Sequence, residues 1–462
     1  MEVLFLIPPA KNYYGKVGLN LMPLGIGYLA SVLEKNGHTV SVIDFQAEPE
    51  KTNTVDFSKY DVVGISSDTP RFNAAIELGR QIRAKGVPVV FGGYHATFLD
   101  DEAINKGAAD FVIRGEGEYP MLELIEKMQR GGELGNIRGL TYKPNGEIKR
   151  NPSASLIQDL DELPFPTRNI FAEDRYLSIF DDRKMATVLT SRGCPFDCYF
   201  CASSRFAGLK WRRRSLDSVF SELDQLIQQG YHSFIFIDDN FTLSYRRTMD
   251  FCNEVLARKW DIKWWCFSRV DSVVKHPDMV RKMAEAGNRS VFLGLESGNQ
   301  DTLDYFQKKT TLEMQEKAVR ILKDNNIRIF GSFILGELHE TRKMIKETIK
   351  FAKKLNPDTC QFSLLTPYPG SRLFQQMEEF KQLITRNWDL YDGAHIVFKN
   401  PNLSVRELHK LFRQAYIRFY MRLSNIPGVI KKFIFDPKEF KEIVHTAYSG
   451  FSVIHQLNNR KS

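Results

Sequence analysis

The first 130 residues alternate between short apolar runs and longer amphipathic segments. The short runs are rich in β-branched residues and predict strands at 3–7, 39–44, 61–66, 87–92 and 111–114. Apolar residues at helical spacing predict helices at 23–36, 71–85 and 119–130. This alternation is typical of an α/β domain with a mostly parallel, doubly wound sheet, which we assign to residues 1–135.

The pattern changes over residues 136–185, which we assign to a connector. Extended runs at 140–143 and 147–150 flank a Pro-Asn-Gly turn and predict a hairpin. The β/α rhythm then returns over residues 186–372. Strands are predicted at 186–190, 233–238, 263–267, 290–295, 327–335 and 359–365, and helices at 216–229, 277–285, 312–325 and 341–355. Six such units predict a partial (β/α)6 barrel of the TIM type, open on one side.

Residues 373–462 lose this rhythm and predict a small helical C-terminal region. Ser404 precedes an amphipathic helix predicted at 405–423, where it fits an N-cap. Basic and aromatic residues follow at 431–435 and 440–453. We expect this region to cap the barrel, and contact with a membrane surface is the less favoured alternative.

The composition indicates a cytoplasmic protein of several domains. Its 462 residues are too many for one core, and no apolar run reaches the length of a membrane span. The first residues predict a strand rather than a signal peptide, and six cysteines without a secreted-type framework indicate the reducing cytosol. The net charge of +8 is dispersed apart from the basic run at 210–214, so we predict solvated faces rather than a nucleic-acid site.

Cys194, Cys198 and Cys201 form a C-x₃-C-x₂-C run just after the strand predicted at 186–190, at the end where barrels place their active sites. Three thiolates this close suit an iron–sulfur cluster or a soft metal, whereas zinc would need a fourth ligand that does not follow closely. A [4Fe–4S] cluster held by three cysteines leaves one iron open to an outside ligand. The other three cysteines are predicted to be small buried hydrophobes: Cys252, Cys266 and Cys360.

This run resembles the radical SAM superfamily, in which S-adenosylmethionine (SAM) binds the fourth iron and is cleaved reductively. The resemblance implies that Asp238 and Asp239 contact the methionine amine and that Glu296 reaches the adenosyl ribose or amine. Asp239 as a helix cap and Glu296 in an ion pair with a barrel arginine are the simpler alternatives. Gly331 begins an element similar to the adenine-packing G-x-I-x-G-x-x-E motif, with a spacing that differs by one residue. The residues implied to hold SAM are Phe200, Asp238, Asp239, Arg269, Glu296, Ser297 and Gly331.

Three loops of the N-terminal domain carry small and polar residues at the edge where open α/β sheets bind ligands. Glycines allow a ligand to approach the backbone, and free amides at helix starts hold polar groups. The chain has no G-x-G-x-x-G fingerprint and no P-loop, which disfavours a nicotinamide or ATP site. Together these loops resemble the cobalamin-binding domain that precedes many radical SAM barrels. The residues implied to hold cobalamin are Ser66, Ser67, Asp68, Thr69, Gly92, Gly93, Tyr94, His95, Gly115, Glu116 and Gly117.

The order of the regions resembles the cobalamin-dependent radical SAM group, which includes methylases and the anaerobic magnesium-protoporphyrin ester cyclase. The resemblance implies a methyltransferase that acts on an unactivated carbon of a small molecule, including lipid-like or tetrapyrrole-like ones, with flavodoxin or ferredoxin as electron donor. The alternatives are a ring-forming cyclase with the same cofactors and a cobalamin or redox sensor without turnover. No D-x-H-x-x-G motif is present, which implies that no protein histidine binds cobalt and leaves Tyr94 or a water beneath the ring.

Overall fold

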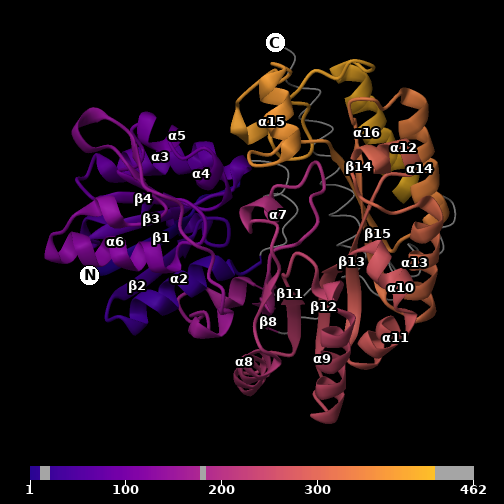
Figure 1. Cartoon of the computed structure of the whole chain (residues 1–462), viewed down its shortest axis with the longest axis horizontal. Helices are drawn as coiled ribbons and strands as arrows, with labels where there is room; N and C mark the ends of the chain where they lie inside the picture. The colour runs from indigo at the N-terminus through magenta and orange to yellow at the C-terminus, as the bar shows by residue number, and fades with distance from the viewer. Residues whose placement is uncertain (11–20, 177–183, 422–462) are drawn as a thin grey trace.

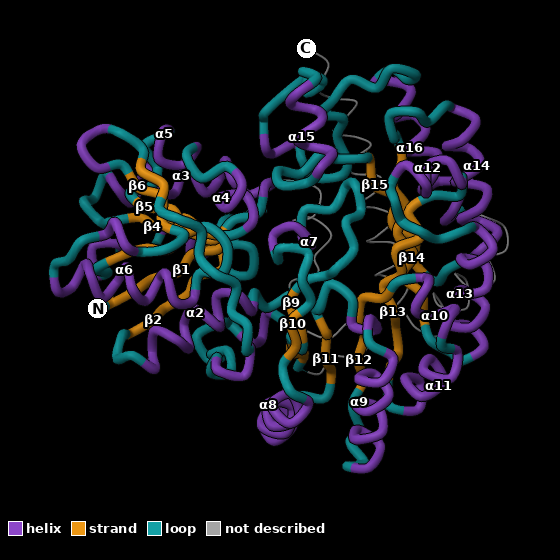
Figure 2. Tube along the Cα trace, in the orientation of Figure 1, coloured by secondary structure: helices purple, strands orange, loops and turns teal. Residues whose placement is uncertain are grey.

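The computed structural model describes residues 1–10, 21–176 and 184–421. Two sheets lie side by side, the N-terminal sheet in indigo and purple and the barrel sheet in magenta and orange (Figure 1). The short helix α7 (Ser203–Phe206) and the loops around it lie between the two sheets (Figure 2). The α/β class and the two-part architecture predicted from the sequence are confirmed.

The N-terminal sheet has the strand order β2-β1-β3-β4-β5-β6-β7. The first five strands run parallel to one another, and the pairs β5–β6 and β6–β7 are antiparallel. The strands are β1 (Glu2–Ile7), β2 (Thr39–Asp44), β3 (Val62–Ser66), β4 (Val89–Gly92), β5 (Phe111–Ile113), β6 (Leu140–Tyr142) and β7 (Lys149–Arg150). The helices are α2 (Leu24–Lys35), α3 (Phe72–Arg83), α4 (Tyr94–Phe98), α5 (Glu102–Asn105) and α6 (Glu118–Arg130). The predicted hairpin is formed by β6 and β7.

Alternation along β1 explains why helices cover both faces of this sheet. Leu4 and Leu6 belong to the core that also contains the buried face of α3. Val3 and Phe5 point the other way, into the core formed with α2 and α6. Because successive side chains of a strand face opposite sides, an apolar strand of this kind must be buried on both.

The barrel sheet has the strand order β15-β14-β13-β12-β11-β8, with every neighbouring pair parallel. The strands are β8 (Met185–Val188), β11 (Ser233–Phe236), β12 (Lys263–Ser268), β13 (Asn288–Glu296), β14 (Arg328–Leu335) and β15 (Thr359–Leu364). The helices are α8 (Leu216–Gln228), α9 (Tyr245–Ala257), α10 (Val270–Lys275), α11 (Pro277–Glu285), α12 (Gln300–Tyr305), α13 (Leu312–Asp324) and α14 (Arg342–Leu355). Strands in sequence order that do not close on themselves form the predicted open barrel.

The two faces of the barrel sheet differ in burial. Leu293 and its neighbours on alternate positions are fully buried in the core shared with the helices. Phe267, Phe292 and Phe330 lie in register across β12, β13 and β14 on the opposite face, and each is only half-buried. Their ring centroids are 5.1 Å apart at each step. The face of the sheet opposite the helix-packed core therefore carries a row of aromatic rings.

The C-terminal residues protect the free edge of the barrel. The helices there are α15 (Arg372–Glu379) and α16 (Val405–Tyr420), and Ser404 caps α16 in a reciprocal capping box with Glu407. The Tyr416 hydroxyl accepts from Phe362 N and donates to Phe362 O, and Tyr420 makes the same pair of bonds to Cys360. An edge strand exposes unpaired backbone groups, and these tyrosines satisfy them.

The segments predicted at 431–435 and 440–453 lie outside the described residues. Within residues 1–10, 21–176 and 184–421, no helix combines the length and the apolar character that crossing a bilayer requires.

Candidate active site between the two sheets

The three cysteines lie between two short strands that form a small sheet, β9 (Ser191–Arg192) and β10 (Arg212–Arg213). These antiparallel strands bracket residues 193–211, which we call the cluster segment. Gly193 opens the segment with a φ of +87°, and a Cβ there would lie 2.1 Å from the Lys210 carbonyl oxygen. Only glycine fits this position, so the entry of the segment is fixed by the backbone.

Cys198 and Cys201 lie on one turn, in which Cys201 N donates to Cys198 O over 3.0 Å. The Arg269 guanidinium lies 3.7 Å from the centre of the Phe196 ring and, through Nη1, 3.8 Å from Cys198 Sγ. Burial raises the pKa of the Cys194 thiol to about 11 and also raises the pKa of Cys201. Arg269 thus places a positive charge beside Cys198 Sγ.

The donor set fits an iron–sulfur cluster better than a single ion. Among the described residues, no three Cys, His, Asp or Glu side chains converge closely enough to hold one metal ion. In a cluster each thiolate binds a separate iron, so its ligands stand farther apart than those around one zinc ion. Three thiolates without a fourth ligand leave one iron for an outside group.

The aromatic residues of the segment fix it to the barrel. Phe200 packs edge-on against Phe306, with ring centroids 5.1 Å apart. Tyr199 N donates to the Phe306 carbonyl over 3.1 Å. Phe200 therefore packs the cluster segment against the barrel, and its contact with SAM stays a prediction.

Asp238 and Asp239 hold the entry of the cluster segment. The buried Asp238 carboxylate accepts from Thr190 N at 2.7 Å, from Thr190 Oγ1 at 2.6 Å and from Ser191 Oγ at 2.5 Å. Asp239 accepts from Gly193 N at 3.0 Å and from the Ser203 hydroxyl. Burial raises the pKa of the Asp238 carboxyl, while these three donors favour its ionised form. Both carboxylates thus have partners inside the protein, and neither caps a helix.

Glu296 pairs with a lysine rather than with the arginine considered from the sequence. Its Oε1 lies 2.5 Å from Lys308 Nζ, and both side chains are buried. Glu296 has a φ of +64°, and a Cβ at Gly294 would lie 2.4 Å from Glu296 Oε1. The Lys308 carbonyl accepts from Arg269 Nη2 at 2.9 Å, which links this pair to the arginine beside Cys198. A non-glycine residue with this backbone is strained, as functional sites often are.

The other two predicted SAM residues are also enclosed by protein. The Ser297 hydroxyl lies 3.1 Å from Thr348 Oγ1 and is fully buried. A Cβ at Gly331 would lie 3.0 Å from Leu295 and 3.2 Å from Pro357, so glycine here allows close packing of strand and loop.

A cavity of about 410 Å³ lies where the carboxyl ends of the N-terminal strands meet the cluster segment. Its walls come from β1, β3, β4, β5, α2 and α6 on one side and from the cluster segment and β10 on the other. The predicted site residues on its wall are Ser66, Gly92, Gly93, Tyr94, Gly115, Glu116, Gly117 and Asp239. The predicted cobalamin residues not among its lining residues are Ser67, Asp68, Thr69 and His95.

His95 lies in the core instead of on the cavity wall. Its ring lies against Phe72, with centroids 3.8 Å apart, and 4.8 Å from the Trp388 ring of the C-terminal region. Nδ1 lies 3.2 Å from Thr69 Oγ1, and burial lowers the pKa of His95 to about 3. Asp68 is likewise engaged, since it binds Arg71 N and the Arg71 guanidinium. These residues join the N-terminal domain to the C-terminal region.

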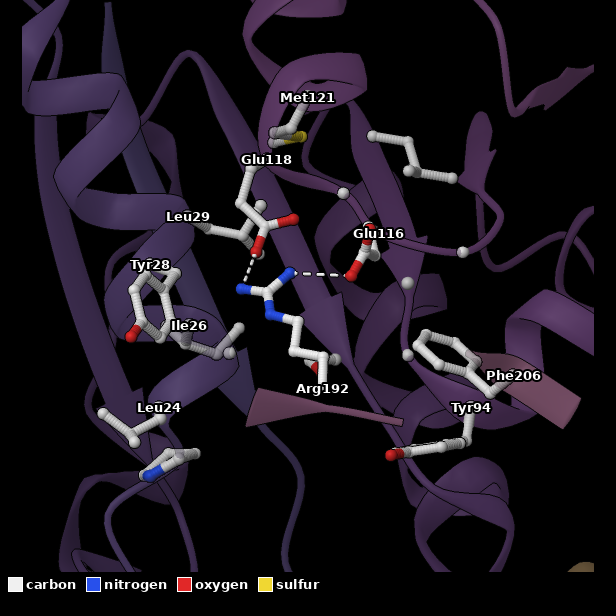
Figure 3. Close-up of a pocket in the computed structure, with 18 of the residues that line it drawn as sticks. Leu24, Ile26, Tyr28, Leu29, Tyr94, Glu116, Glu118, Met121, Arg192 and Phe206 are labelled. Atoms are coloured by element: carbon white, nitrogen blue, oxygen red, sulfur yellow. Dashed lines mark hydrogen bonds and ion pairs between the residues drawn. The ribbon is translucent and has the colours of Figure 1, made fainter. Parts of the chain in front are cut away.

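Tyr94 reaches from the N-terminal domain to the cluster segment. It is the first residue of α4, and its ring packs against Phe206 of α7 with centroids 4.5 Å apart (Figure 3). Although 45% of its surface is reached through the cavity, surrounding protein and the nearby Asp239 raise its pKa to about 12. The phenol is therefore protonated at neutral pH, close to Cys201.

Two glutamates and two arginines form a buried charged group on the cavity wall, and Figure 3 shows Arg192 between Glu116 and Glu118. Arg192 Nη1 lies 2.9 Å from Glu116 Oε1, and its Nη2 lies 2.7 Å from Glu118 Oε1. Arg212 Nη1 lies 2.9 Å from Glu116 Oε2 and its Nη2 lies 3.0 Å from Glu116 Oε1. Glu116 was predicted from the sequence, but the arginines were missed because their partners are 76 and 96 residues away.

Two family models match the chain. The B12 binding domain matches residues 11–125, which include β2 to β5. The Radical SAM superfamily matches residues 188–352, from the end of β8 into α14.

The chain is similar to an uncharacterised methyltransferase of Pyrococcus horikoshii, at 36% identity over 97% of this chain and 98% of that one. It is also similar to the anaerobic magnesium-protoporphyrin IX monomethyl ester cyclase of Rubrivivax gelatinosus, at 29% identity over 91% of this chain and 78% of the cyclase. A solved structure of the radical SAM methyltransferase TsrM from Kitasatospora setae, with cobalamin and a [4Fe-4S] cluster bound, matches with a TM-score of 0.70. That match covers 82% of this chain and 78% of the other at 20% identity, and it shows a shared fold.

Proposed function

The chain belongs to the radical SAM superfamily and carries a B12-binding domain before its barrel, and on this basis we propose that it methylates an unactivated carbon of a small molecule. The observation that carries the proposal is the cavity, because one space borders both the glycine loops of the N-terminal domain and the cluster segment. When bound, the cluster and SAM supply a hydrogen-abstracting radical, and cobalamin supplies the methyl group.

The residues that line the cavity suit cobalamin. The cavity runs below the strand ends between the sheet and the helices α2 and α6, and most of its lining side chains are apolar. Gly92, Gly93 and Gly115 give a large flat ring access to the backbone at its mouth. We assign cobalamin to this cavity, with Tyr94 on its wall and no histidine among the residues that line it.

The protein's own residues hold the cluster and orient SAM. Cys194, Cys198 and Cys201 bind three irons, and Arg269 keeps a positive charge beside Cys198. We keep Glu296 as a partner of the SAM amine or ribose, in addition to Lys308, because a carboxylate accepts several hydrogen bonds. Asp238 and Asp239 act as positioning residues through the backbone of Thr190 and Gly193.

The barrel face opposite the helix-packed core, with its aromatic row, favours a substrate with a flat or extended apolar surface. The aromatic row of Phe267, Phe292 and Phe330 is half-exposed there. Aromatic rings bury large apolar areas and stack on planar groups, which suits a lipid-like or tetrapyrrole-like molecule.

A cyclase is the second candidate, favoured by the 29% identity to the Rubrivivax gelatinosus enzyme over 91% of this chain. SAM with a deuterated methyl group, supplied to the reduced, cobalamin-loaded protein with candidate substrates, separates the two reactions. A methyltransferase places the label in the product, whereas a cyclase forms a product without it. Release of 5′-deoxyadenosine tests turnover itself, and its absence would favour a sensor.

We also propose a cytoplasmic protein that receives its electron from a small donor such as flavodoxin or ferredoxin. The support is chemical: all six cysteines are free, and a reduced cluster persists in a reducing compartment. Peripheral contact with a membrane is not part of the proposal, since it depended on segments outside the described residues.

A further inference from the structure

The buried charged group on the cavity wall has an arrangement that goes beyond local stability. Glu116 and Glu118 lie on the loop after β5 and at the start of α6, within the B12-binding domain. Arg192 and Arg212 lie on β9 and β10, the two strands that bracket the cluster segment. We call these four residues the clamp. Through it, one loop of the cobalamin domain holds both the entry and the exit of the segment that carries the cysteines.

Several hydrogen bonds hold the clamp residues to one another and to the neighbouring backbone. Glu116 accepts from both arginines and from Ile157 N at 2.8 Å, and Arg212 also donates to the Ile157 carbonyl at 2.6 Å. Burial disfavours the ionised carboxylate, but the hydrogen bonds from Arg212 and Arg192 hold the pKa of Glu116 below its usual value. The group therefore stays charged and paired, and displacement of one member shifts the others.

All four clamp side chains line the cavity, and Arg192 stands two residues before Cys194. A molecule that fills the cavity contacts the clamp and restricts its movement. When Arg192 and Arg212 move less, β9 and β10 and the cluster segment between them also move less, because the two strands pair with each other. The clamp supplies a connected set of contacts between the two sites, through which energetic coupling can be carried.

We infer that the clamp couples the two cofactors, so that cobalamin in the cavity helps retain the iron–sulfur cluster. The inference rests on the proposed function, since it assumes cobalamin in this cavity and a cluster on the three cysteines. Linkage makes the coupling reciprocal at equilibrium: the factor by which cobalamin raises the affinity for the cluster is the factor by which the cluster raises the affinity for cobalamin.

The test uses the full chain reconstituted with iron and sulfide, with and without hydroxocobalamin. Loss of the cluster absorbance is followed after addition of an iron chelator. In the parent protein we expect cobalamin to slow this loss by about five- to tenfold, the lower part of the usual range of site-to-site coupling. Glu118→Gln removes the negative charge that pairs with Arg192 but keeps both bonds of Arg212 to Glu116, and it should reduce the factor to below about twofold.

Two further variants control for folding and for charge. Arg192→Lys keeps the positive charge but cannot span both glutamates, so cobalamin should protect the cluster by an intermediate factor in this variant. If Glu118→Gln does not fold, Arg192→Lys provides the test of the clamp. Asp224→Asn breaks the exposed pair with Arg258 at α8, away from the cavity, and should keep the full factor. Because each factor is a ratio within one variant, a general loss of cluster stability cancels.

The outcomes separate the inference from the function beneath it. A parent protein that binds no corrinoid or assembles no cluster overturns the proposed function. A parent protein that binds both without protection of the cluster, or a Glu118→Gln protein with full protection, overturns the clamp while the function stands.

Discussion

The strand ends of the two sheets carry polar residues in similar positions, but those residues have different tasks. After β4 and β5 of the N-terminal sheet, the glycine loops line the cavity. After β11 and β13 of the barrel, the carboxylates are already bound. Asp238 accepts three hydrogen bonds from Thr190 and Ser191, and Glu296 pairs with Lys308.

The difference shows how far position at a strand end predicts a ligand contact. Such a residue lies near the site in either sheet, since parallel strands bring their carboxyl ends to one edge. Whether it touches the ligand depends on which partners the protein itself supplies. In the barrel the nearby cluster segment needs support from its surroundings, and Asp238 and Asp239 give it.

The largest expected effect follows from removing a thiolate. Cys198→Ala should abolish SAM cleavage, because in the proposed function each cysteine binds a separate iron. The measurement is 5′-deoxyadenosine release by the anaerobically reconstituted, reduced protein. Cys252→Ala is the control: this thiol is fully buried in the helix-side core, so cluster and cleavage should persist. Cleavage at the parent rate in Cys198→Ala would refute the cluster assignment.

Glu296→Gln tests whether a paired barrel carboxylate also serves SAM. Loss of a charge-assisted hydrogen bond of roughly 1.5–3 kcal/mol should weaken SAM binding by about one to two orders of magnitude. Iron content and the corrinoid spectrum should not change. Binding is measured by titration with SAM under anaerobic conditions.

The double variant Glu296→Gln/Lys308→Met decides between a ligand and a structural pair. If Glu296 only neutralises Lys308, removing both charges restores SAM affinity, because no buried charge is left unpaired. If Glu296 contacts SAM, affinity stays low in the double variant. Recovery of affinity would therefore move Glu296 to the group of supporting carboxylates with Asp238.

Asp238→Asn should act on the cluster segment more than on SAM. The amide nitrogen of asparagine would face donors that now point at a carboxylate, which costs about 1–3 kcal/mol of unfolding free energy. We expect a lower midpoint in denaturant unfolding and faster loss of iron. An unchanged iron content and midpoint, together with weaker SAM binding, would mean that Asp238 contacts SAM and does not support the cluster segment.

The sequence predicted the elements well because both sheets are built from β-branched apolar runs of strand length. It did not predict α9, whose buried stripe contains Thr248 and Cys252 beside Phe251 and Val255 and so has a weak apolar pattern. At the site, it placed the cysteines and the glycine loops, which are contiguous motifs. It could not place Lys308, Arg192 or Arg212, since their partners come from other strands and loops and local spacing does not encode them.

The smallest effect concerns His95, which shares a motif with the cavity residues but lies in the core. Its pKa of about 3 in the folded protein is below the usual 6.5, so the unfolded chain binds a proton between these values and the folded chain does not. Stability is therefore complete above about pH 6.5 and falls on acidification, by about 2 kcal/mol at pH 5. His95→Phe should remove this part of the acid sensitivity, measured as unfolding free energy against pH. It should leave the corrinoid spectrum intact, because the ring contacts Phe72 and Trp388 rather than the cavity. A changed Co(II) paramagnetic resonance spectrum in this variant would place the histidine at the cofactor after all.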